Sequence, residues 1–311
     1  MNRRQLVKDG IAHRTTERVP YCIDFTREAK EKFQRETGNR SVDEFLDNDI
    51  VQVSPPWWGW DNLGPEWKAA DAPRSLPGVK GNGSYGDFRD QLKLLRDHSD
   101  KYILAMIYGS HFEKANNARG IENFLADLAG EPAFAQKLLD RIIEKNMVML
   151  DNFLGCPEID GVLLGSDWGS QLDLLMSPDT WEAMIRPGEQ REYDLVHGFG
   201  KDVWVHSCGC IVKAIPSLIE MGLDVLNPVQ PECMDLAMLK DNYGDRLAFW
   251  GGISTQKALP YGTADEVRAE ARRVRDLMSK DGGYILSPAQ QLQVDVPTGN
   301  VLALIDVAKN G

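Results

Sequence analysis

The sequence predicts an α/β protein that folds as a single (β/α)8 (TIM) barrel over residues 1–311, with an extended loop or hairpin insertion after the second strand. Eight short apolar stretches recur along the chain, and a helical segment follows all of them but the second, which is the alternation that such a barrel requires. The Gly-x-Gly-x-x-Gly turn that would favour an open doubly wound sheet is absent after the first stretch. A chain of 311 residues is also a suitable length for one barrel.

The expected strands are short apolar runs bounded by turn residues. They cover residues 18–26, 49–56, 101–108, 161–168, 202–210, 224–231, 247–254 and 283–290. Capping residues or a 3.6-residue apolar period mark the expected helices. These cover residues 27–37, 121–128, 132–153, 212–221, 235–242, 264–278 and 299–308, and a further helix begins at Ser177. From residue 57 to about residue 90 no helical period appears, and this segment is the expected insertion.

Charge and cysteine content exclude several classes of protein. The formal net charge is −12, from 47 acidic and 35 basic residues, so we expect no nucleic-acid partner and no anionic membrane partner. No apolar run reaches the roughly 18 residues of a membrane span, and no apolar segment follows the charged start. Five cysteines spread along a long chain favour reduced thiols over a disulfide framework. Together these features predict a cytoplasmic enzyme.

The strand at 202–210 ends in the chemically richest motif of the chain. His206 and Cys208 are two residues apart, so both side chains point to the same side of a strand. In a barrel the carboxyl ends of the strands line the mouth where the chemistry is found, and an imidazole with a thiolate is the start of a zinc site. Taken singly, each is more often a hydrogen-bonded barrel histidine or a small buried cysteine. Candidates for a further ligand are Cys210, Glu232, Cys233 and Asp167.

A second group of polar residues follows the strand at 161–168. Asp167 and Trp168 stand where this strand meets its loop, and a carboxylate beside an indole has a raised pKa and can act as an acid or base. The alternative, a carboxylate that caps the following turn, has nearly equal weight. Asp24 and His111 follow two other strands and are expected at the same mouth.

Three tryptophans, Trp57, Trp58 and Trp60, open the expected insertion. They can form a stacking wall for a flat ligand, although packing beneath a long loop is the commoner use of such residues.

Five segments together resemble the uroporphyrinogen decarboxylase superfamily. They are residues 165–171 (GSDWGSQ), 203–209 (VWVHSCG), 224–230 (DVLNPVQ), 248–253 (AFWGGI) and 282–289 (GGYILSPA). The resemblance extends over most of the chain and implies a (β/α)8 barrel. It also implies one of two activities: decarboxylation of the acetate arms of uroporphyrinogen without a cofactor, or methyl transfer between a corrinoid and a thiol or other acceptor, in which zinc activates the thiol.

The resemblance separates these two activities residue by residue. Decarboxylases of the family carry an arginine-rich stretch after the first strand, whereas this chain has only Arg27 there, which cannot make several bidentate contacts with carboxylates. His206 and Cys208 match the His-x-Cys of the zinc-dependent methyltransferases. Where those enzymes place a glutamate and a second cysteine, this chain has Gln230 and Gln290, and neutral amides weaken zinc binding.

The resemblance therefore favours a methyltransferase that moves a methyl group between a corrinoid carrier and a small acceptor with the help of zinc. Asp167, His206 and Cys208 are the expected catalytic residues. The expected partners are a small-molecule substrate and a corrinoid carrier protein, and a homodimer is compatible with the sequence. The residues expected to bind substrate are Asp24, Arg27, Trp58, His111, Trp168, Gln230 and Gln290.

Two other functions stay open from the sequence. One is a carboxy-lyase that acts on a porphyrinogen-like or other carboxylated substrate, with Asp167 as the central carboxylate and Arg27 as the anchor. The other is a non-catalytic tetrapyrrole or corrinoid binder, which the two glutamines, Gln230 and Gln290, support best.

Overall fold

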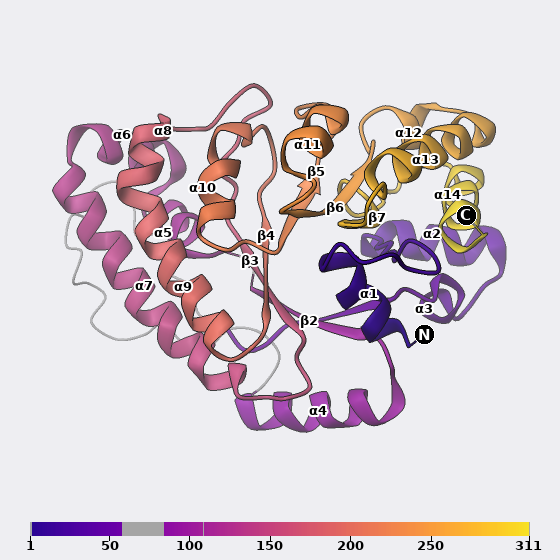
Figure 1. Ribbon diagram of the computed structural model, residues 1–311, viewed down its shortest axis with the longest axis horizontal. Helices are drawn as coiled ribbons and strands as arrows, with labels where there is room; N and C mark the ends of the chain where they lie inside the picture. The colour runs from indigo at the N-terminus through magenta and orange to yellow at the C-terminus, as the bar shows by residue number, and fades with distance from the viewer. Residues whose placement is uncertain (1, 58–83, 108, 311) are drawn as a thin grey trace. The chain divides into compact units, whose positions relative to one another are not determined.

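The computed structural model describes residues 2–57, 84–107 and 109–310 (Figure 1). Contacts between residues divide the chain into two compact units. Unit 1 comprises Met1–Val51, Asp100–Tyr102 and Val225–Gly311, and unit 2 comprises Gln52–Ser99 and Ile103–Asp224. The expectation of a single domain over residues 1–311 stays a prediction. Trp58, Trp60 and most of the expected insertion lie outside the described residues.

Unit 2 is built on β2 (Tyr102–Ile107), β3 (Gly161–Gly165) and β4 (Asp202–His206). Both pairings are parallel, and Ile107 pairs with Leu164 while Gly165 pairs with His206. All residues of β2 and β3 are buried, as expected for parallel strands with both faces covered. The register therefore brings the carboxyl ends of β3 and β4 level with each other.

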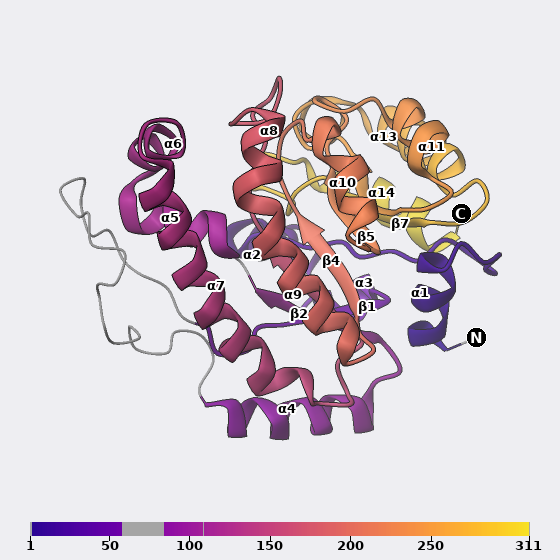
Figure 2. The same cartoon turned by 60° about the vertical axis from the view of Figure 1, so that its left-hand side comes forward.

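Helices surround these strands and bury apolar side chains at helical spacing. In α7 the buried positions include Leu138, Ile142, Met149 and Phe153. Helix α7 packs against α9 and α5, and Figure 2 shows the three helices next to one another. The helices of unit 2 are α4 (Tyr85–His98), α5 (His111–Arg119), α6 (Ile121–Gly130), α7 (Pro132–Leu154), α8 (Pro178–Thr180), the π-helix η1 (Trp181–Ile185), α9 (Arg186–Gly198), the 3-10 helix η2 (Val212–Ala214) and α10 (Ile215–Glu220).

Unit 1 repeats the same arrangement with β5 (Val225–Val229), β6 (Ala248–Ile253) and β7 (Tyr284–Pro288), which are paired in parallel. β1 (Ile50–Val53) begins in unit 1. Its helices are α1 (Arg3–Ile11), α2 (Arg27–Thr37), α3 (Val42–Leu46), α11 (Leu236–Tyr243), α12 (Ala258–Tyr261), α13 (Ala264–Met278) and α14 (Thr298–Asn310). Thr263 caps α13 and exchanges hydrogen bonds with Glu266, as the sequence pattern predicts.

The observed elements confirm the α/β class. Among the described residues, seven strands lie in the sheet in the same order as in the sequence, and helices connect them. This is the topology of a TIM barrel. The first expected strand, 18–26, is present only as two isolated bridges, Tyr21 to Leu286 and Phe25 to Leu292. The chain there passes alongside β7 without forming a continuous ladder.

The prediction of an irregular segment up to about residue 90 is wrong at its end, because α4 begins at Tyr85. Ser84 and Asp87 form a capping box there, and Phe88 and Leu92 bury one face of the helix at a spacing of four residues. The remaining part, residues 58–83, lies outside the described residues.

The sequence interpretation also missed α5. This helix immediately follows β2 and carries two of the charged residues discussed below.

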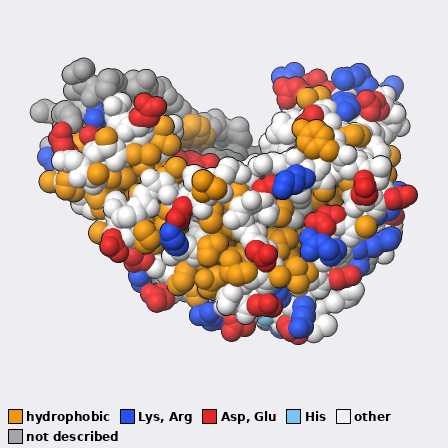
Figure 3. Space-filling view, turned by 90° about the horizontal axis from the view of Figure 1, so that it is seen from above, with side chains coloured by type: hydrophobic (Ala, Val, Ile, Leu, Met, Phe, Trp, Pro, Cys, Tyr) orange, Lys and Arg blue, Asp and Glu red, His pale blue; other side chains and the backbone are white. Residues whose placement is uncertain are grey.

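Basic and acidic side chains are interspersed on the face shown in Figure 3. No helix among the described residues is long and apolar enough to cross a membrane.

Candidate active site at the ends of β3 and β4

The site depends on the register of two neighbouring strands. Gly165 of β3 pairs with His206 of β4, and the backbone N–H of Ser166 donates to the carbonyl oxygen of His206 at 2.9 Å. Asp167 comes one residue later, so its carboxylate lies beside the imidazole. The hydrogen bonds between β3 and β4 thus bring Asp167 next to His206, which the sequence alone could only suggest.

Three ligand-type side chains meet at this point. Nε2 of His206 lies 3.4 Å from Sγ of Cys208 and 3.7 Å from Oδ1 of Asp167. One ligand atom from each of the three residues lies within 4.8 Å of the others. Only 12% of the His206 side chain is exposed, against 45% of the Asp167 side chain, so the group opens to solvent through the carboxylate. An imidazole, a thiol and a carboxylate are the donors that zinc binds, and three protein ligands leave a fourth position for a reactant.

The two loops that carry these residues touch backbone to backbone. A Cβ atom on Gly169 would lie 2.6 Å from the carbonyl oxygen of Cys208, and one on Gly209 would lie 2.5 Å from the carbonyl carbon of Gly169. Gly209 also has φ +81°, a conformation that favours glycine. The N–H of Cys210 donates to the carbonyl oxygen of Ser170 at 2.7 Å. Glycine at both positions therefore permits the contact that orients Asp167 and Cys208.

Two hydrogen bonds hold Asp167, one at its carboxylate and one at its own backbone N–H. The N–H of Cys208 donates to Oδ1 of Asp167 at 2.8 Å. The N–H of Asp167 itself donates to Oε1 of Glu113 at 3.4 Å. Burial, and then the negative charge of Asp167, raise the pKa of the Glu113 carboxyl. Glu113 is thus a second acidic group at the site, and it holds a proton more readily than an ordinary glutamate does.

Sequence reasoning missed Glu113 because it missed α5. A signal was present, since Ser110 and Glu113 have the spacing of a capping box at a helix start. In the structure Ser110 is the N-cap residue but makes no capping hydrogen bond with its side chain. Its hydroxyl bonds to carboxylates of α9 instead.

Two residues expected at the mouth are buried in unit 2. Trp168 has no exposed surface and packs edge-on against Trp181, with ring centroids 5.4 Å apart. His111 is also fully buried, and its Nδ1 lies 3.0 Å from Oε1 of Glu189 in α9. Both side chains therefore belong to the packing of unit 2, which does not support contact with a substrate.

Unit 1 holds most of the other expected site residues, whereas Cys210 belongs to unit 2. Arg27 is 87% exposed at its side chain and pairs with Glu31 at 3.0 Å, which does not suit a buried carboxylate anchor. Gln230 is buried and Gln290 is exposed. The hydroxyl of Ser254 donates to Glu232, so this carboxylate already has a partner. Asp24 and Cys233 also belong to unit 1.

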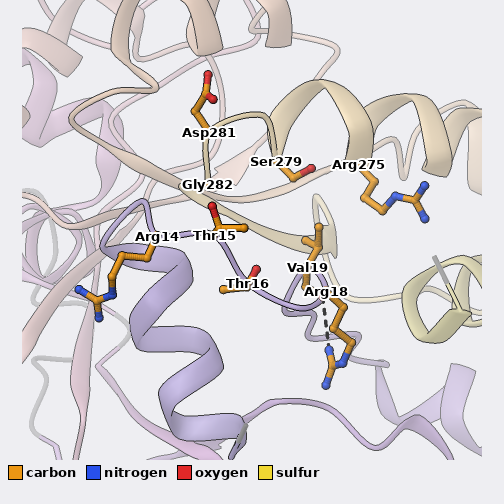
Figure 4. Close-up of a pocket in the computed structure, with 9 residues that line it drawn as sticks. All are labelled: Arg14, Thr15, Thr16, Arg18, Val19, Arg275, Ser279, Asp281 and Gly282. Atoms are coloured by element: carbon orange, nitrogen blue, oxygen red, sulfur yellow. Dashed lines mark hydrogen bonds between the residues drawn. The ribbon is translucent and has the colours of Figure 1, made fainter.

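Unit 1 also contains a hollow of about 320 Å³, shown in Figure 4. Its three arginines bond to carboxylates: Arg14 to Asp9, Arg18 to Asp49, and Arg275 to Asp276. In Figure 4 the side chains of Arg14 and Arg275 extend in opposite directions. The hollow therefore does not gather positive charge around a common point. Its lining residues are Arg14, Thr15, Thr16, Arg18, Val19, Arg275, Ser279, Asp281 and Gly282.

Parallel strands that alternate with helices define a barrel-type α/β protein. The ligand-type residues at two adjacent strand ends give it a candidate metal-binding active site. The family model for uroporphyrinogen decarboxylase (URO-D) matches residues 70–311. Because this match covers most of the chain, the protein belongs to the URO-D family.

Individual proteins are also similar to this chain. The methylcobamide:CoM methyltransferase MtaA of Methanosarcina barkeri is 28% identical over 132 residues, which is 42% of this chain and 36% of that protein. The matched segment thus spans only about a third of that relative. Among solved structures, a methyltransferase from Methanosarcina mazei aligns with a TM-score of 0.73 and 16% identity over 100% of this chain and 99% of its own. An endo-1,4-beta-mannanase from Rhizomucor miehei aligns with a TM-score of 0.53 and 9% identity over 95% of this chain and 96% of its own. At these identities the two structures show a shared fold.

Proposed function

We propose that this protein is a methyltransferase that moves a methyl group between a corrinoid carrier and a small acceptor, with a thiol as the acceptor that best suits the site. The observation that carries the proposal is the meeting of Asp167, His206 and Cys208 at the ends of β3 and β4. The name of the relative from Methanosarcina barkeri, a methylcobamide:CoM methyltransferase, supports the same chemistry.

The donor set fits a zinc ion. The imidazole nitrogen of His206 and the sulfur of Cys208 lie close enough together to bind one ion, and a carboxylate oxygen of Asp167 lies beside them. We assign His206 and Cys208 as the residues that would hold zinc. When bound, zinc lowers the pKa of a thiol so that the thiolate is the nucleophile at neutral pH.

The residues of this chain perform the remaining tasks. Asp167 accepts the proton that the acceptor thiol loses, because its Oδ1 is held by the N–H of Cys208 while nearly half of the side chain is exposed to a substrate. Glu113 holds the backbone of Asp167 and so positions the carboxylate. Gln230 and Gln290 are proposed to bind the substrate. The segment after the second expected strand, which includes Trp58, is proposed to face the corrinoid.

The test measures methyl transfer from methylcobalamin to a thiol, and the spectral change of the corrinoid is the readout. His206→Ala and Cys208→Ala are expected to lose transfer activity together with one bound zinc ion per chain. Cys156→Ala serves as the matched control, because Cys156 is a buried cysteine of the same unit and belongs to no ligand group among the described residues. Cys210→Ser tests whether this neighbour contributes a ligand. Full activity and full zinc content in both His206→Ala and Cys208→Ala would remove the proposed site.

The decarboxylase alternative receives less support from the site. Arg27, its proposed anchor, is exposed and paired with Glu31 on the same helix. Release of carbon dioxide from a porphyrinogen, measured beside the methyl-transfer assay, distinguishes the two activities. The non-catalytic binder instead predicts a spectral change of the corrinoid without turnover.

A further inference from the structure

A second group of ligand-type side chains lies buried inside unit 2, among the helices. It consists of His111 on α5 and of Glu189 and Glu192 on α9. All three residues have no exposed surface, and one ligand atom from each lies within 4.8 Å of the others. None of them belongs to the group at the ends of β3 and β4.

Short contacts hold this group together. Nδ1 of His111 lies 3.0 Å from Oε1 of Glu189. The hydroxyl of Ser110 donates to Oε2 of Glu192 at 2.7 Å, and Nδ2 of Asn146 in α7 donates to Oε1 of Glu192 at 2.7 Å. Three helices therefore contribute to one buried polar centre, and two glutamates lie side by side within it.

Several polar atoms of this centre lack a hydrogen bond to any described residue. They are Nε2 of His111, Oε2 of Glu189, Oδ1 of Asn146 and the hydroxyl of Tyr193. Tyr193 and Asn146 are themselves fully buried, and the bond from Asn146 to Glu192 keeps its carboxamide at the centre. Buried polar groups are normally paired, so unpaired atoms that surround two carboxylates point to a missing partner. Carboxylate and amide oxygens accept only, which makes a cation the partner that suits them.

A cavity lies on one side of the imidazole of His111, and its lining does not include Glu189 or Glu192. This small cavity of about 40 Å³ reaches His111 between α7 and α9, and Asp140 and Arg191 are among its lining residues. This volume is enough for a water molecule or a single ion. Gly188 lets the backbone of α9 approach the imidazole, since a Cβ atom there would lie 2.9 Å from Nε2 of His111 and from the side chain of Ile143. The glycine therefore permits close packing of α9 against the ring.

The charges of the centre agree with a cation, because two carboxylates lie together where the side chains have no exposed surface. The buried ammonium of Lys114 donates to the backbone carbonyl oxygen of Gly109.

We propose that His111, Glu189 and Glu192 bind a divalent metal ion that clamps α5 to α9. One imidazole and two carboxylates suit a borderline or hard ion such as Zn²⁺, Mn²⁺ or Fe²⁺, whereas the thiolate of Cys208 makes the other group selective for softer ions. The role of this buried ion is structural, because the residues that bind it are closed to a substrate. The inference does not depend on the proposed methyl transfer.

The experiment counts metal ions in the full-length protein by mass spectrometry after incubation with Zn²⁺ or Mn²⁺ and removal of the excess. The double variant His206→Ala/Cys208→Ser removes the first group and is expected to keep one ion per chain. Addition of Glu189→Gln and Glu192→Gln is expected to remove that ion. Asp151→Asn, an exposed carboxylate on α7, is the matched control and is expected to leave it in place.

Co²⁺ provides a readout that tells the two groups apart. In the His206→Ala/Cys208→Ser variant, bound Co²⁺ is expected to show visible ligand-field bands without the sulfur-to-metal band that Cys208 would give. The same variant is expected to gain thermal stability on addition of Zn²⁺ or Mn²⁺. Should the glutamine variants fail to fold, His111→Gln in the same background is expected to lose both the ion and the gain in stability. A well-folded His206→Ala/Cys208→Ser protein that binds no ion and shows no change in melting temperature would overturn the inference, and it would leave the proposed methyl transfer untouched.

Discussion

The backbone N–H of Cys208 donates a hydrogen bond to Oδ1 of Asp167 at 2.8 Å. This bond joins the loop after β4 to the loop after β3, so the position of the carboxylate and the position of the thiol are set together. Four predictions follow from this connection and from the packing around it.

The first prediction concerns the charge of Asp167. Asp167→Asn keeps an oxygen that can accept the N–H of Cys208 but removes the base, so methyl transfer is expected to fall by roughly 10²–10⁴-fold. The melting temperature is expected to stay close to that of the wild type, because the backbone bond survives. The measurement is kcat across pH together with the zinc content. An unchanged kcat would show that Asp167 does not handle the proton.

The second prediction concerns the contact between the two loops. Gly209→Ala adds a methyl group where φ is +81° and where a Cβ atom would lie 2.5 Å from the backbone of Gly169. We expect a loss of about 1–3 kcal/mol in the free energy of unfolding from the strained backbone alone, together with weaker zinc binding. Urea denaturation and metal analysis measure the two effects.

Gly155→Ala is the control for this prediction. A Cβ atom on Gly155 would meet nothing within 4 Å, and its backbone is right-handed helical, so the substitution is expected to be neutral or slightly stabilising. Equal effects of the two substitutions would argue against the close approach of the loops.

The third prediction concerns the aromatic packing beneath the site. Trp168→Ala removes a fully buried indole that packs against Trp181, and is expected to cost about 3–5 kcal/mol of unfolding free energy. Leu172→Ala is the control, since Leu172 is 89% exposed on the same loop and is expected to change stability by less than about 0.5 kcal/mol. Trp168→Phe is expected to retain more activity than Trp168→Ala. A raised substrate KM with little loss of unfolding free energy would instead place Trp168 in contact with the substrate.

The fourth prediction concerns pH and the pair His197 and Asp224. Nε2 of His197 lies 2.9 Å from Oδ2 of Asp224, and this hydrogen bond raises the pKa of the imidazole. A raised pKa in the folded state means that the protonated form is stabilised by folding. This contribution is therefore fully present below the unfolded pKa of about 6.5 and is lost as the pH rises through the folded pKa.

The measurement compares the free energy of unfolding of the wild type and His197→Gln between acidic and mildly alkaline pH. The difference between the two proteins is expected to shrink as the pH rises. Both side chains are about one third exposed, so solvent screening keeps the effect small. A difference that grows with pH would contradict the assignment.

Much of the fold could be predicted because it depends on local patterns. Apolar runs and capping residues predicted the α/β class, and the chain forms strands within seven of the eight expected ranges. The first range failed because its residues form only two isolated bridges, one to Leu286 in β7 and one to Leu292 beyond it. A sequence carries no signal for how many hydrogen bonds a strand makes with its neighbour. Helix α5 was missed because its apolar residues, such as Phe112 and Ala115, lie in a short segment with little periodicity.

The sequence by itself determined that His206 and Cys208 share one side of a strand end, since alternate residues of a strand point the same way. The tertiary structure decided their neighbours. The register between β3 and β4 brought Asp167 to the imidazole, and α5 brought Glu113 to Asp167. The packing of the helices placed His111 with Glu189. These contacts join residues 41–78 positions apart in the chain, and only the packing of strands and helices fixes which distant residues meet.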